Sequence, residues 1–149
     1  MKPNKACAVV IRELDGETSI LAFRHPQAGC QLVKGSIESG ESPAAAAERE
    51  LWEEAGLRAR ASIDLGTFDT QHEHQVWSIH VCTTESDLPN NWTHGCEDDG
   101  GHSFEFFWHP LDAGASNEWH PVFARALDFV RNALASPSLR AGAPTESID

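Results

Sequence analysis

The sequence predicts one α+β domain, in which short strands form a sheet and helices pack against it. Three observations predict this class: short apolar runs near the N-terminus, a strongly helical segment in the middle of the chain, and alternating runs followed by a second helical period. A length of 149 residues fits a single domain. We expect this domain to span residues 1–136. The polar, proline-bearing tail at 137–149 is predicted to be disordered.

The first strands are predicted to form a hairpin. Residues 6–12 (ACAVVIR) and 18–24 (TSILAFR) are apolar runs, and the turn signal Asp15-Gly16 lies between them. A third apolar stretch at 30–33 leads into a segment rich in glycine and serine, which we interpret as a loop.

The next element is a helix with clear start and stop signals. The hydroxyl of Ser42 can cap the free amides of the first turn, and Pro43 suits that turn because its missing N–H costs nothing there. Residues 44–47 are four alanines, which favour a helix. Gly56 then ends the helix as a left-handed cap.

Further strands and a second helix follow. Residues 62–68 and 75–83 alternate as half-buried strands that we expect to pair antiparallel, and residues 104–110 form another strand. A helix is predicted over about 119–135, with Pro121 in its first turn. The intervening residues, 84–101, carry no periodicity and are expected to be a long functional loop.

Composition excludes several kinds of partner. The chain has 11 basic and 23 acidic side chains, and its net charge of −12 repels nucleic-acid polymers and anionic membranes. Charges interrupt every apolar run near the N-terminus, so neither a signal peptide nor a membrane span is expected, and we predict a cytoplasmic protein. The four cysteines form no CxxC pair, which predicts reduced thiols rather than disulfides or a zinc ribbon.

The first helix carries a stripe of carboxylates. Glu50, Glu53 and Glu54 lie three and four residues apart, so they share one side of a helix that turns about 100° per residue. Their mutual repulsion disfavours simultaneous ionisation unless a cation offsets it, and Mg²⁺ prefers oxygen ligands of this kind. The alternative is a solvated acidic face with Arg49 as an intrahelical partner.

The residues around this stripe form a longer pattern. Gly35 is followed by five residues, then by Glu41, then by seven more residues and the run RELWEEAGL at 49–57. At every specified position this pattern resembles the signature of the Nudix hydrolase (MutT-like) family. The resemblance implies a Nudix fold, an α/β/α sandwich with a mixed β-sheet between helices. It also implies hydrolysis of a nucleoside diphosphate linked to another group X, by a protein that is monomeric or homodimeric.

The resemblance also implies roles for residues of the motif. Magnesium or manganese would be held by three carboxylates, one of which can orient the attacking water; these are Glu50, Glu53 and Glu54. A backbone carbonyl at Lys34 or Gly35 would complete the ligands. Arg49 would anchor the glutamates, and Glu41 would fix the loop without binding the metal itself.

Candidates outside the motif have two interpretations each. Lys34 and Arg24 can meet a substrate phosphate, although Arg24 is equally an ordinary charge at a strand end. Trp92 can stack on a nucleobase or anchor its loop. The acidic run in the long loop can supply a further metal ligand or base, or remain a solvated charge run; it comprises Glu97, Asp98 and Asp99. We interpret His72 and His74 as surface histidines.

Substrate identity is less constrained than the chemistry. Residues 31–41 (QLVKGSIESGE) resemble the loop of dinucleoside polyphosphate hydrolases, but Val33 stands in place of a proline and the chain has no tyrosine. The subfamily is therefore unassigned. The leading hypothesis is a Mg²⁺-dependent pyrophosphohydrolase for a small nucleotide such as a dinucleoside polyphosphate, a nucleotide sugar or a (d)NTP. The alternative is a non-catalytic Nudix module that binds a nucleotide and regulates a partner.

Overall fold

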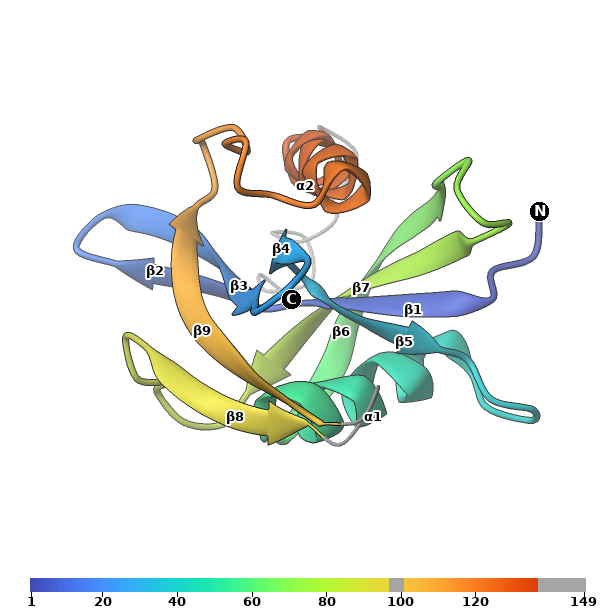
Figure 1. Ribbon diagram of the computed structural model, residues 1–149, viewed down its shortest axis with the longest axis horizontal. Coiled ribbons are helices and arrows are strands. Elements are labelled where there is room, and N and C mark those ends of the chain that lie inside the picture. Colours follow the sequence, from blue (N-terminus) through green and yellow to red (C-terminus); the bar gives the residue numbers. More distant parts are fainter. Residues whose placement is uncertain (97–100, 137–149) are drawn as a thin grey trace, which may run out of the picture.

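Nine strands and two helices make up the computed structural model, which describes residues 1–96 and 101–136 (Figure 1). The strands are β1 (Lys5–Val9), β2 (Ile11–Leu14), β3 (Glu17–His25), β4 (Gly29–Gln31), β5 (Val33–Ser36), β6 (Ala59–Asp69), β7 (Val76–Thr84), β8 (Trp92–Cys96) and β9 (His102–Pro110). The helices are α1 (Pro43–Ala55) and α2 (Pro121–Leu134). The α+β class predicted from the sequence is confirmed.

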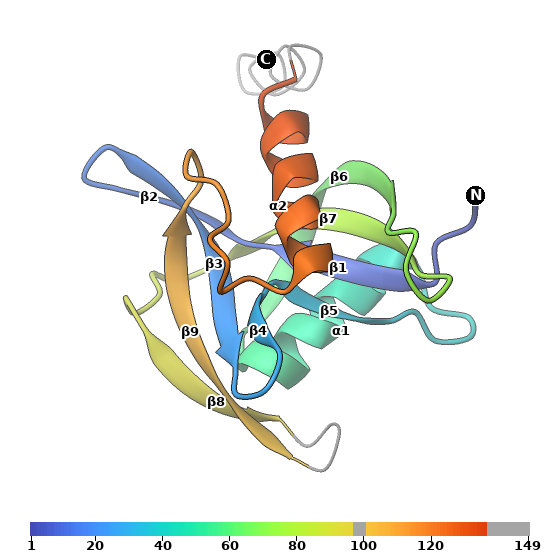
Figure 2. The ribbon, with the colours of Figure 1, turned by 45° about the horizontal axis from the view of Figure 1, so that its top comes forward.

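The strands form two sheets rather than one. The first has the order β5-β1-β7-β6 and is mixed, since β1 and β7 run parallel while the other pairs are antiparallel. The second is antiparallel and has the order β2-β3-β9-β8, with β4 beside β3. Helices α1 and α2 lie on opposite sides of the strands (Figures 1 and 2). The mixed sheet between helices is therefore present, with a second sheet beside it.

The predicted N-terminal hairpin is only half correct. The run at 6–12 divides at Val10: β1 joins the mixed sheet, and only β2 pairs with β3, in a register that sets Ile11 opposite Ile20. Residues Ala6 to Val10 are buried throughout, whereas β2 is partly exposed. The division follows from non-local pairing of β1 with β5 and β7, which a local apolar pattern does not reveal.

The predicted loop at 84–101 contains a strand. Its residues 92–96 form β8, which pairs antiparallel with β9. The indole of Trp92 donates a hydrogen bond to the carbonyl of Ala55 (3.1 Å) and stacks on Phe106. A segment this short and polar shows no strand period of its own. Glu97, Asp98 and Asp99 lie outside the described residues, as does the tail at 137–149.

Local signals place helix α1 as expected. The Ser42 hydroxyl accepts a hydrogen bond from the backbone N–H of Ala45 (3.1 Å), and Pro43 is the first helical residue. Gly56 adopts φ 73°, the left-handed conformation of a helix C-cap, and its N–H donates to the carbonyl of Trp52. The helix thus begins and ends at the predicted residues, which fixes the direction of its carboxylate stripe.

Apolar side chains hold α1 and α2 against the strands. Helix α1 buries Ala46, Ala47, Leu51 and Ala55, and α2 buries Val122, Phe123, Ala126, Leu127 and Val130. Cys7, Cys30 and Cys82 are buried and free, as expected for reduced thiols, and burial raises the pKa of Cys82 to about 12. Within residues 1–96 and 101–136, neither helix has the length and apolar character needed to cross a membrane.

Candidate active site

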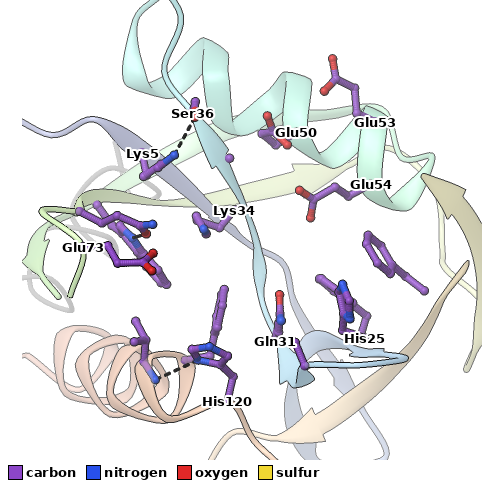
Figure 3. Close-up of a pocket in the computed structure, with 18 of the residues that line it drawn as sticks. Lys5, His25, Gln31, Lys34, Ser36, Glu50, Glu53, Glu54, Glu73 and His120 are labelled. Carbon is purple, nitrogen blue, oxygen red and sulfur yellow. Dashed lines mark hydrogen bonds between the residues drawn. The ribbon is translucent and has the colours of Figure 1, made fainter. Parts of the chain in front are cut away.

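An open cavity of about 630 Å³ lies between the two helices and the mixed sheet (Figure 3). Strand β5 contributes Lys34 and Gly35, and helix α1 contributes the three glutamates of the stripe. Lys5 lies on β1, and His120 is the residue that precedes α2. The cavity therefore gathers most of the motif predicted from the sequence, together with residues far from it in the chain.

Two carboxylates of the stripe are buried together. Glu50 is 5% exposed and Glu54 is 8% exposed, and both face the cavity in Figure 3. Burial, followed by the adjacent Glu50 carboxylate, raises the pKa of Glu54 well above its usual range. The charge of the Lys34 side chain, followed by a hydrogen bond from the Lys34 backbone amide to Glu54, opposes this rise. A pair of buried acids is unfavourable when both are charged, so the arrangement calls for a positive partner.

Glu50 carries an unsatisfied atom at the centre of this pair. Its Oε2 accepts a hydrogen bond from Arg49, but its Oε1 is buried and has no hydrogen-bond partner. A Cβ added at Gly35 would overlap the carboxyl group of Glu50. Glycine is thus required where β5 passes α1, because only the missing side chain leaves room for this carboxylate.

Arg49 ties the carboxylates to the loop before α1. Its guanidinium donates to Glu41 (2.8 Å), to Glu50 (2.8 Å), to Glu53 (3.2 Å) and to the backbone carbonyl of Ser36 (2.8 Å). Hydrogen bonds from Arg49 lower the pKa of Glu41 to about 2, and hydrogen bonding to Glu41 in turn raises the pKa of Arg49. One partly buried cation therefore orients two cavity carboxylates and holds the loop against the helix.

Glu41 also takes part in the clamp, the set of hydrogen bonds by which Arg49 joins the loop before α1 to the helix. Besides binding Arg49, its carboxylate accepts a hydrogen bond from the backbone N–H of Glu38 (3.0 Å). Glu41 is not among the residues that line the cavity.

The stripe is less uniform than helical spacing suggests. The side chain of Glu53 is 43% exposed, against 7% for Glu50, and it bends towards Arg49. Accordingly, the side chains at 1–96 and 101–136 bring no three His, Cys, Asp or Glu groups into a ready metal-ligand cluster. Like charges converge only when a cation offsets their repulsion. The residues nevertheless fit a hard cation such as Mg²⁺, since they offer carboxylate oxygens and an unpartnered buried Oε1 beside a glycine gap.

Two residues considered as substrate contacts lie elsewhere. Arg24 packs over the ring of Phe107 (4.3 Å), and Trp92 packs on Phe106 (5.1 Å between centroids). Both line a separate cavity of about 550 Å³. The structure therefore does not bring Arg24 and Trp92 to the glutamates, and the contacts of Trp92 are those of an anchor.

The structure adds residues that sequence reasoning missed. Lys5 and His120 line the main cavity, and so do His72 and Glu73, whose side chains are 46% and 68% exposed. No local pattern marks them. Lys5 reaches the site only because β1 pairs with β5 in a register that sets it opposite Ser36.

A family model decides the broader identity of the chain. The model of the NUDIX domain matches residues 2–128. The chain belongs to the Nudix family. This membership confirms the resemblance found in the sequence and the predicted enzyme class, hydrolysis of phosphoric anhydride bonds. No curated protein sequence gives a significant match.

Solved structures share the Nudix fold at low identity. An ADP-ribose pyrophosphatase from Streptococcus suis matches with a TM-score of 0.63 and 17% identity, over 91% of this chain and 95% of that one. A UDP-X diphosphatase matches with a TM-score of 0.64 and 16% identity, over 90% of this chain and 64% of that one. The NUDIX domain of Shewanella oneidensis NrtR, in complex with ADP ribose, matches with a TM-score of 0.62 and 14% identity, over 91% and 90% of the two chains.

Replacing Gly35 with alanine tests the fit between β5 and α1. The added Cβ must displace the Glu50 carboxylate, which is the end of a side chain and can move without unfolding the protein. We expect Gly35→Ala to weaken Mg²⁺ binding in calorimetry by about 10- to 100-fold, with a melting temperature close to that of the wild type. Gly114→Ala is the matched control, since a Cβ there meets nothing within 4 Å. Unchanged Mg²⁺ affinity in Gly35→Ala would contradict the assignment of Glu50.

Proposed function

We propose that this Nudix protein is a Mg²⁺-dependent pyrophosphohydrolase that cleaves a nucleoside diphosphate linked to another group X. The observation that carries the proposal is the buried pair Glu50 and Glu54, with the unpartnered Oε1 of Glu50 set against Gly35 in an open cavity. Buried acids of this kind suit a cation site better than a structural role, because without a cation they cost stability. Mn²⁺ would suit the same oxygen ligands.

The charges of the chain explain why a metal would be needed. A protein of net charge −12 whose cavity is lined by five glutamates repels a polyphosphate. Bound Mg²⁺ would neutralise phosphate oxygens and lower the pKa of a water ligand. Glu50, Glu53 and Glu54 would hold the ion, and one of the three would accept the proton of the attacking water. Arg49 would keep Glu50 and Glu53 in place through its hydrogen bonds.

The substrate class follows from the family and the cavity together. The matched structures include an ADP-ribose pyrophosphatase, a UDP-X diphosphatase and a complex with ADP ribose. The compounds in these names are small nucleotides. We propose a substrate of that size, with Lys34 as a phosphate contact in the cavity. Nucleic-acid polymers and membranes are not proposed as partners. The proposed setting is the cytoplasm, and the proposed assembly is a monomer or homodimer.

A substrate panel tests this function. The panel contains dNTPs, dinucleoside polyphosphates, ADP-ribose, NADH and nucleotide sugars, each with Mg²⁺ and with EDTA, and products are resolved by chromatography. We expect Mg²⁺-dependent cleavage of at least one class at a pyrophosphate bond. Nucleotide binding without turnover of any class would instead favour the regulatory module.

Neutralising one buried acid should separate activity from stability. We expect Glu54→Gln to lower kcat/KM by at least about 10²-fold, because the cavity loses a charged oxygen ligand. Its metal-free melting temperature should be no lower than that of the wild type, because the change removes an acid that is buried beside Glu50. Glu48→Gln is the control on the same helix: the Glu48 carboxylate accepts a hydrogen bond from the N–H of Ala61 and lies outside the cavity. A large loss of stability in Glu54→Gln would point to a structural role.

A further inference from the structure

The cavity has a second, basic part opposite the carboxylates. Its lining includes the carboxylate of Glu73, the ring of His72 and three further side chains, Lys5, Lys34 and His120. We call these three residues the basic lobe. In Figure 3, Lys5 and Lys34 lie across strand β5 from Glu53 and Glu54, and His120 lies beside helix α2. The motif predicted from the sequence assigns no role to Lys5 or His120.

The ammonium group of Lys34 has no anionic partner in the basic lobe. Its Nζ lies over the rings of Trp77 (5.5 Å from the centroid) and Phe123 (5.9 Å). Across residues 1–96 and 101–136, no carboxylate forms an ion pair with it. Burial, followed by the charge of Lys5, lowers the pKa of Lys34. A partly desolvated cation beside a second cation is unfavourable unless an anion joins them.

A hydrogen bond to Ser36 orients the side chain of Lys5 near Lys34. Its Nζ donates a hydrogen bond to the Ser36 hydroxyl (2.7 Å), and the pairing of β1 with β5 sets these two residues opposite each other. Glu50 and Glu54 partly offset the charge of Lys34 in the free protein. A metal ion held by these glutamates would take up their charge, so that an anionic ligand would have to offset the charges of Lys5 and Lys34.

His120 supplies a neutral donor on the other wall. Its Nδ1 accepts a hydrogen bond from the backbone N–H of Val122 (3.2 Å), so in the neutral ring the proton lies on Nε2. Burial, then the neighbouring His72 and Lys34, lowers the pKa of His120 and favours this neutral form. Glu73 lines the same cavity, and its carboxylate lies 3.5 Å from Nε2 of His72; within the part of the chain that the structure describes, it forms no ion pair with either lysine. The Nε2–H of His120 therefore remains available to a ligand.

We propose that the basic lobe binds an anionic group carried by X, a phosphate or a carboxylate beyond the scissile pyrophosphate. The inference rests on the proposed function and makes it narrower: among nucleoside diphosphate derivatives, those with a charged X are preferred. Lys5 and Lys34 supply the counter-charge, and His120 donates a hydrogen bond. The carboxylates of α1 and this lobe thus divide the ligand between a metal-bound pyrophosphate and a protein-bound anion.

Matched ligand pairs test the lobe by calorimetry, in the presence of Ca²⁺ to limit turnover. UDP-glucose and UDP-glucuronate differ by one carboxylate, and ADP-ribose and ADP-ribose 1″-phosphate differ by one phosphate. We expect wild-type protein to bind the charged member of at least one pair about tenfold more tightly, as one charge-assisted contact allows. The pair that shows the preference tells whether the anion is a carboxylate or a phosphate.

Variants then assign the preference to the lobe. Lys5→Met should reduce the ratio of the two dissociation constants to below about threefold. His120→Asn should reduce it as well, since asparagine can still cap α2 but lacks the Nε2 donor. Lys2→Met, an exposed lysine outside the cavity, should keep the wild-type ratio.

The outcomes separate this inference from the proposed function. Equal affinity for both members of each pair in the wild type, no binding of any of the four ligands, or a ratio unchanged by Lys5→Met, would overturn the inference. If Mg²⁺-dependent cleavage of the panel is still seen, the proposed function stands without it. Tighter binding of the charged ligands without cleavage of any substrate would support the basic lobe as a binding site and contradict the proposed hydrolase activity.

Discussion

The hydrogen bonds of Arg49 join two segments that the chain folds separately, the loop before α1 and the carboxylate face of that helix. One guanidinium contacts Glu41, Glu50, Glu53 and the carbonyl of Ser36. Because the loop is clamped to the helix, Gly35 stays against the Glu50 carboxylate and the cavity keeps its shape. Charge-assisted bonds to a planar fork are strong and directional, so this residue can hold several acids that would otherwise repel one another.

The same clamp explains how charge is distributed over the cavity. Arg49 compensates one oxygen of Glu50 and leaves the other without a partner, while Glu54 is buried beside it. The acidic side thus carries more negative charge than Arg49 alone offsets. On the basic side, Lys34 is desolvated next to Lys5, and Glu54 and Glu50 offset its charge only in part. A metal ion would offset the negative charge of the glutamates, and an anionic nucleotide would offset the positive charge of the lysines. In this way the cavity favours a metal–nucleotide complex over either component alone.

The predictable features are those encoded within a few residues of one another. Ser42 and Gly56 mark the ends of α1 through local hydrogen bonds, and the helical spacing of the glutamates places them on one side. Non-local pairing decides the rest. The division of the first apolar run at Val10, the strand β8 and the arrival of Lys5 beside β5 all depend on sheet register, which residues near each other in sequence do not specify. Helical spacing alone did not predict that Glu53 differs from Glu50 and Glu54: its side chain is exposed and forms an ion pair with Arg49.

The central claim is that Glu50 and Glu54 form a cation site that is destabilising without its ion. The most direct measurement is the melting temperature of the wild-type protein and of Glu50→Gln across millimolar Mg²⁺, with NaCl at matched ionic strength as reference. Ligand that binds only the folded state raises stability with its concentration. We predict that Mg²⁺ raises the melting temperature of the wild type progressively beyond the NaCl reference, and that Glu50→Gln loses most of this rise. A melting temperature that follows ionic strength alone, or an equal rise in both proteins, would contradict the account.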